Sequence, residues 1–140
     1  MRKMKIVLPL LILVLCIIFL IFAIPQLKSD KAGVFFVKER SWFSDFQVQG
    51  QAVEFLCEIT LKNTSEAPAQ IKIRGSFPED VGRLLEEDFL IAKGDDGEDA
   101  VFFVPAKSEK TFTVFFVGTF AGVNEKHDRT LPELEIIRVP

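Results

Sequence analysis

Residues 51–76 read QAVEFLCEITLKNTSEAPAQIKIRGS and contain two stretches in which apolar and polar side chains alternate. Five apolar residues of the first stretch share one face of an extended chain: Val53, Phe55, Cys57, Ile59 and Leu61. The second stretch repeats the pattern, with Ile71 and Ile73 on one face and basic residues on the other. A period of two is typical of half-buried antiparallel strands. The segment therefore predicts two strands joined by a turn at Asn63-Thr64-Ser65.

Similar short apolar stretches recur about every ten residues through the rest of the C-terminal part, with turn residues between them. Further strands are predicted at 34–37, 42–48, 88–92, 100–104, 111–117 and 134–139. Seven or eight short strands favour an all-β fold, an immunoglobulin-like antiparallel β-sandwich. Pro78-Glu79-Asp80 predicts one or two helical turns, because proline suits the first helical position and acids suit the first turn. Val81, Leu84 and Leu85 would then be buried.

The N-terminal part differs in composition. Residues 6–24, IVLPLLILVLCIIFLIFAI, contain no charged side chain. A helix over this range would be about 28 Å long, close to the thickness of the bilayer hydrocarbon. The basic side chains of Arg2, Lys3 and Lys5 precede it, and positive residues favour the cytoplasmic side. We therefore expect a single-pass cell-membrane protein with a cytoplasmic N-terminus.

Four segments follow from this interpretation. They are a basic cytoplasmic tail (1–5), an uncleaved signal-anchor helix (6–24), a tether (25–32) and an extracytoplasmic β-sandwich domain (33–140). The helix would contact lipid along its length, from Ile6 through Leu15 and Cys16 to Ile24. The inverted topology, with the domain in the cytoplasm, is the alternative.

Two other interpretations of the apolar segment fit less well. A cleaved signal peptide has a shorter apolar region, and a cut after Ala23 would be followed by Ile24-Pro25. A lipoprotein signal needs a small residue before the modified cysteine, whereas Cys16 follows Leu15. Cys16 is therefore interpreted as a small apolar residue in the membrane.

The segment of the two central predicted strands also resembles a known family of domains. Residues 53–77, VEFLCEITLKNTSEAPAQIKIRGSF, resemble the long strand, Asn-Thr-Ser turn and returning strand of the FxLYD and telokin-like extracellular domains of Gram-positive bacteria. Residues 101–118, VFFVPAKSEKTFTVFFVG, are similar to the penultimate hairpin of those domains. The FxLYD element itself is absent, and residues 75–78 stand roughly in its place. The resemblance implies an immunoglobulin-like, surface-anchored and non-catalytic domain, and it transfers no functional residue.

Composition argues against several classes of function. A net charge of -3 and a pI near 5.2 argue against nucleic acid, whose phosphates require a basic surface. One His, two Cys and no Tyr offer few groups for catalysis or for a zinc site. His127 and Asp128 are neighbours, but adjacent side chains of an extended chain point apart. We therefore expect no enzyme activity and no cofactor.

Two polar loops have alternative interpretations. Four acids in the segment 95–99 could together hold Ca²⁺: Asp95, Asp96, Glu98 and Asp99. Asp96-Gly97 also suits the tip of a hairpin, which is the interpretation that we favour. Asn63-Thr64-Ser65 is formally a glycosylation acceptor, and we favour a simple turn.

Three phenylalanine doublets are the strongest indication of binding. Phe35-Phe36, Phe102-Phe103 and Phe115-Phe116 would place Phe on both faces of their strands. One face must point toward the core, and an exposed apolar surface is typical of a protein or membrane contact. Alternation predicts the outward members, and hence the partner contacts, as Phe36, Phe103 and Phe115. The alternative is that loops cover both faces.

These features predict a membrane-anchored, non-catalytic interaction module, an accessory subunit that binds another bacterial envelope protein. The tether reaches only about 15 Å as a flexible chain, so the partner would be a membrane protein or one held close to the bilayer. An immunity or sensor protein that binds a toxin or a small ligand at the cell surface is the alternative. The sequence leaves the oligomeric state open.

Overall fold

The computed structural model describes residues 9, 11–18, 33–125 and 128–140. The chain divides into two compact units, Met1–Lys31 and Ala32–Pro140. Residues 11–18 of the first unit are helical. Among the residues that the structure describes, no helix is both long enough and apolar enough to cross a membrane. Much of the predicted anchor, including Ile6 and Ile24, lies outside the described residues, whereas Leu15 and Cys16 belong to the described helical segment.

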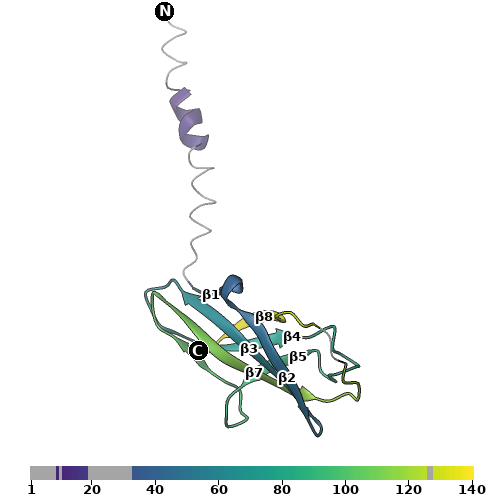
Figure 1. Ribbon diagram of the computed structural model, residues 1–140. Helices are drawn as coiled ribbons and strands as arrows, with labels where there is room; N and C mark the ends of the chain where they lie inside the picture. Colours follow the sequence, from purple (N-terminus) through teal and green to yellow (C-terminus); the bar gives the residue numbers. More distant parts are fainter. Residues whose placement is uncertain (1–8, 10, 19–32, 126–127) are drawn as a thin grey trace, which may run out of the picture. The chain divides into compact units, whose positions relative to one another are not determined.

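The second unit is built from antiparallel strands and one short 3₁₀ helix (Figure 1). The strands are β1 (Val34–Phe36), β2 (Trp42–Gln49), β3 (Ala52–Asn63), β4 (Ala69–Ser76), β5 (Phe89–Lys93), β6 (Phe102–Val104), β7 (Ser108–Thr119) and β8 (Glu133–Arg138). The 3₁₀ helix η1 (Lys38–Arg40) lies between β1 and β2. The prediction of an antiparallel all-β domain is confirmed, and a strand occurs at each predicted place.

The eight strands form one sheet that folds into two layers. β3 pairs along its whole length with β7, and its other edge pairs with β1 and β2. We call these four strands the front layer, because they lie in front in Figure 1. β4 pairs with β6 and β5 on one edge and with β8 on the other, which gives the back layer.

Strand β5 joins the two layers on one side. Its first residues, Phe89–Ile91, pair with β4, whereas Ala92 and Lys93 pair with β7. On the opposite side, the described strands leave one edge of β2 and one edge of β8 without a strand partner. The folded sheet is therefore closed along β5 and, among the described strands, open between β2 and β8.

The alternation in β3 and β4 gives rise to the core. Val53, Phe55, Cys57, Ile59 and Leu61 are fully buried, as the pattern predicted, and so are Ile71 and Ile73 of β4. Full burial of such side chains contributes about 1.5–3 kcal/mol each relative to exposure. The Phe55 ring stacks on Phe77 with centroids 4.6 Å apart, and Phe77 meets Phe116 edge-on at 5.5 Å. These rings connect the two layers.

The predicted helical turns after Pro78 are wrong. The segment forms turns and two isolated bridges, Val81 with Leu85 and Leu85 with Phe120. Gly82 has a φ of 76°, a left-handed conformation that ends a right-handed helix. Leu84 and Leu85 are buried as predicted, whereas Val81 is exposed.

The turn after β3 is confirmed, and it accounts for the buried Asn63. The Asn63 side-chain amide donates to the carbonyls of Ala67 and Val104, at 2.9 and 3.1 Å. Its Oδ1 accepts a hydrogen bond from the Ser65 amide. An amide held in this way is buried inside the protein, so the structure favours the turn over glycosylation.

Candidate functional site

The structure places one member of each phenylalanine doublet outward. Phe102 and Phe116 are buried, so Phe103 and Phe115 point outward as predicted. The first doublet is the reverse of the prediction. Phe36 lies opposite the buried Leu61 and packs against the core, while Phe35 is 48% exposed. Alternation cannot decide between neighbours, because the choice depends on the register with β3.

The three predicted contact residues do not form one surface. Phe115 lies on the outer side of the front layer, opposite the half-buried Leu56 of β3. Phe103 lies opposite the exposed Gln70 on the outer side of the back layer. Phe36 points inward, at the open side of the sandwich. Whether any of them touches a partner remains a prediction.

The outer side of the front layer gathers further apolar side chains around Phe115. The strand registers place Trp42, Glu58 and Thr113 in one row, Asp45, Leu56 and Phe115 in the next, and Gln47, Glu54 and Val117 in a third. We call the apolar members of these rows the front apolar face: Trp42, Leu56, Phe115 and Val117.

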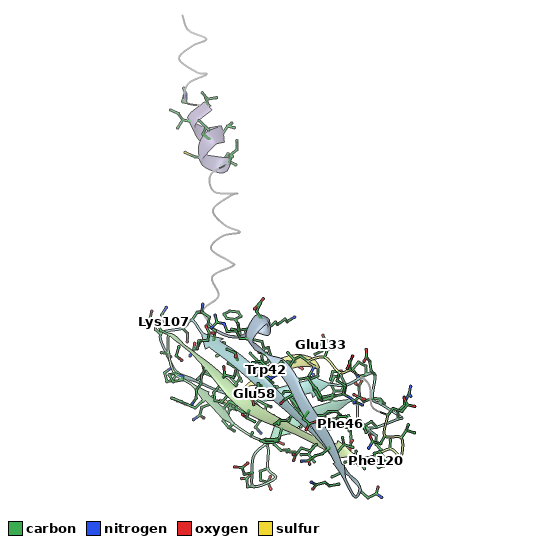
Figure 2. All side chains as sticks on the ribbon, in the orientation of Figure 1. Trp42, Phe46, Glu58, Lys107, Phe120 and Glu133 are labelled. Carbon is green, nitrogen blue, oxygen red and sulfur yellow. The ribbon has the colours of Figure 1, made fainter. Side chains whose placement is uncertain are left out.

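Trp42 is the most open member of the front apolar face, with 53% of its surface exposed, and the other three are half-buried. Figure 2 shows Trp42 and Glu58 on the front of the sheet. Trp42, Leu56 and Val117 were not among the contact residues predicted from the sequence. Leu56 did carry a signal, since it is the one large apolar residue on the polar side of β3.

Acidic side chains border this face on β2 and β3, and Lys93 of β5 stands opposite Phe115 at its other edge. Glu54, Glu58 and Asp45 stand in the same rows as its apolar members. The Thr113 hydroxyl donates to Glu58 at 3.0 Å, and the Gln47 amide donates to Glu54 at the same distance. These bonds hold the carboxylates in place beside the apolar members.

The acidic turn after β5 borders the same face. A groove of about 430 Å³ lies between this turn and the sheet, and it is lined by Glu54, Phe115, Val117, Gly94 and Asp95 among others. The tip is a tight turn, because Gly97 has a φ of 80° and the Gly94 amide donates to the Glu98 carbonyl. The flanking strands do not form the predicted hairpin, since β5 and β6 both pair with β4 and not with each other. The acidic turn thus adds negative charge at the edge of the front apolar face.

Two of the four candidate calcium ligands, Asp96 and Asp99, are already engaged within the protein. The two carboxylate oxygens of Asp99 accept from Lys93 and Lys72, at 2.8 and 3.4 Å. The hydrogen bond from Lys93 lowers the pKa of Asp99, and that from Lys72 adds to the effect. Asp96 accepts a hydrogen bond from the Glu98 amide. Within 33–125 and 128–140, no three acidic, His or Cys side chains are placed to hold a metal ion.

Cys57 is a fully buried cysteine of β3. Burial raises the pKa of the Cys57 thiol to about 12, and the nearby Glu58 carboxylate contributes. Such a thiol is protonated at neutral pH and is a poor nucleophile. His127 lies outside the described residues.

Comparison with known proteins adds no relative to this description. No family model matches the chain, and neither a similar curated protein nor a similar solved structure was found. The interpretation of the front apolar face therefore depends on its own chemistry.

Proposed function

We propose that this protein is a membrane-anchored, non-catalytic interaction module whose β domain lies outside the cytoplasm and binds another bacterial envelope protein as an accessory subunit. The observation that carries the proposal is the front apolar face, on which Trp42, Leu56, Phe115 and Val117 lie side by side on adjacent strands. Contiguous exposed apolar surface is typical of a protein contact. Tryptophan and other aromatic side chains contribute much of the binding free energy in such contacts.

The chemistry of the surroundings indicates the kind of partner. Glu54, Glu58, Asp45 and Asp95 border the front apolar face. Opposite charges across an interface accelerate association and fix its orientation. The partner surface would therefore present an apolar centre with Lys or Arg around it.

The anchor and the fold family are part of the same proposal. The charge-free segment 6–24 after three basic residues supports a signal anchor with the N-terminus in the cytoplasm. Two antiparallel layers around a common core support an immunoglobulin-like sandwich, as does the resemblance of residues 53–77 to FxLYD and telokin-like domains.

A labelling experiment tests the topology. Asp96 is exposed at the tip of the acidic turn, so Asp96→Cys would present an accessible thiol, while the native Cys57 is fully buried. An impermeant maleimide should label Asp96→Cys in whole cells and leave the wild-type domain unlabelled. Labelling that requires cell lysis would place the domain in the cytoplasm and contradict the proposal.

A second experiment tests the binding surface. Full-length protein would be cross-linked in its native cells, purified in mild detergent and examined for a stoichiometric membrane partner. The variant Trp42→Ser/Phe115→Ser should recover at least roughly 30-fold less partner, because loss of even one central aromatic contact costs about 2 kcal/mol or more. Its melting temperature should fall by less than about 10 °C, as expected for a loss of about 1 kcal/mol at Phe115, so the domain stays folded.

The matched control is Phe89→Ser/Phe103→Ser, which removes two rings that are 55% and 49% exposed on the back layer. This variant should recover as much partner as the wild type. Equal loss in both variants would argue against a specific front-face contact. Recovery of the wild-type protein alone would contradict a stable accessory subunit and favour the alternative of an immunity or sensor protein.

A further inference from the structure

The open side of the sandwich contains a cavity that the proposed function does not use. It measures about 140 Å³, and its lining includes Phe43, Phe77, Pro78, Arg129, Leu131 and Pro132. A groove of about 540 Å³ shares residues 130–133 with this cavity and extends to Phe36, Lys38 and Leu134. Together they form a trough with a mixed apolar and polar lining along the side that β5 does not close.

Arg129 lies at one end of this trough, and its side chain is only 6% exposed. Its Nη2 donates to Asp80 Oδ1 at 3.0 Å and more weakly to the Glu125 carbonyl at 3.5 Å. The guanidinium carbon lies 4.1 Å from the centroid of the Phe46 ring. The guanidinium is therefore held in position by an ion pair at one edge and an aromatic ring at its face.

Two nitrogens of this buried guanidinium lack a partner. Within the described part of the chain, Nε and Nη1 of Arg129 form no hydrogen bond and are not exposed to solvent. A buried donor without an acceptor is destabilising, so such groups in native proteins are usually satisfied. Arg129 also lines the cavity, and an acceptor that enters there would require the guanidinium to turn these two nitrogens toward it.

The charges around the cavity select the kind of acceptor. Asp80 already neutralises Arg129, and Glu79 and Glu133 add two more carboxylates to the lining. This surplus of negative charge disfavours a free carboxylate or phosphate. An uncharged carbonyl oxygen, such as that of a peptide bond, satisfies the donors of Arg129 without this repulsion.

We propose that the trough is a second binding site, which takes an extended, uncharged and apolar segment of a partner polypeptide. A main-chain carbonyl of that segment would accept from Arg129, and an apolar side chain would fill the cavity beside Phe43 and Leu131. Within the described residues, β8 pairs only with β4, so its second edge can add main-chain hydrogen bonds to an extended chain. This site is separate from the front apolar face and does not depend on it.

Arginine side-chain NMR tests the proposal on the full-length chain in detergent micelles. The probe is acetyl-Ala-Leu-Ala N-methylamide, an uncharged peptide with carbonyl acceptors and one apolar side chain. The Arg129 Nε–H signal, identified by its proximity to the Phe46 ring, should move downfield in a saturable way. The signal of Arg83, which is exposed and paired with Glu125, should stay in place.

A blocking variant provides the control. Thr130 is exposed and lines both the cavity and the groove, so Thr130→Trp should fill the trough and abolish the Arg129 shift. Thr130→Ser should retain the shift. Three results would overturn the proposal: no response to the peptide, an equal response to sodium acetate, or an unchanged response in Thr130→Trp. None of these results bears on the Trp42 experiment, so the two sites are tested separately.

Discussion

The outer sides of the two layers both expose aromatic rings, yet they differ in what surrounds those rings. On the back layer, the Arg74 guanidinium carbon lies 4.8 Å from the Phe89 ring centroid, and Arg74 also pairs with Glu135. On the front layer, Trp42 stands in a row with Glu58 and Thr113, which bond to each other. The exposed fraction of the side chain alone would rank Phe89 and Trp42 as equal candidates, at 55% and 53%. We therefore expect a ring that already contacts a cation of its own layer to be the weaker candidate for binding.

The largest expected effect is a difference in the free energy of unfolding between substitutions of two neighbouring residues. One of them lies in the core and the other on the front apolar face. Phe116→Ala removes a fully buried ring and should lower the free energy of unfolding by about 3–5 kcal/mol. Phe115→Ala removes a half-buried ring of the front apolar face and should cost about 1 kcal/mol. Equilibrium urea denaturation followed by circular dichroism measures both. Similar losses would mean that Phe115 belongs to the core and cannot serve as a free contact.

A smaller effect, a coupling free energy between neighbouring side chains, should distinguish the exposed rings of Phe89 and Trp42. A double-mutant cycle with Arg74→Met and Phe89→Ala should give a coupling free energy of about 0.5–1 kcal/mol, because the cation lies over the ring. The matched cycle with Trp42→Ala and Glu58→Ala should give a coupling close to zero. A coupling at Trp42 as large as that at Phe89 would remove the distinction between the layers.

The smallest effect concerns the ion pairs of Asp99, which join the acidic turn to β5 and the back layer. The hydrogen bond from Lys93 lowers the pKa of Asp99, so Lys93→Met should raise it toward its ordinary value. Because the folded pKa lies below the unfolded one, this carboxylate stabilises the protein above the unfolded pKa. That contribution is lost as the pH falls through the folded pKa. Carbon-13 NMR of the Asp99 carboxyl group measures the shift, with Lys62→Met as a remote control.

Two kinds of sequence signal predicted the fold well. Strict alternation located β3 and β4 and the seven apolar side chains that are fully buried on their inner faces. When only one side of a strand is apolar, a period of two leaves a single choice for the face that points toward the core. The turn residues at Asn63–Ser65 and at Gly97 marked real turns. The segment after Pro78 failed because a single left-handed glycine, Gly82, prevents a helix that its apolar spacing suggested.

Less of the candidate site could be predicted from the sequence. The register of β2 shifts between Phe43 and Asp45, so Phe43 and Phe46 both point inward although they are three positions apart. Unbroken alternation from Phe46 and Val48 would have placed Trp42 inward, and the bulge turns it outward. The orientations of Phe35 and Phe36 were predicted the wrong way round, because they are set by the pairing of β1 with β3. The pairing of Arg129 with Asp80, distant in the sequence, depends on tertiary structure alone.

The central claim is that the front apolar face, and not the back layer, contacts an envelope partner. The most direct measurement replaces Trp42 or Phe89 with a photo-cross-linking amino acid in the full-length protein and irradiates native cells. The two positions are almost equally exposed, so only the presence of a partner distinguishes them. The account predicts a discrete covalent adduct with a membrane protein from position 42 and none from position 89. An adduct from position 89 alone, or none from either position, would contradict it.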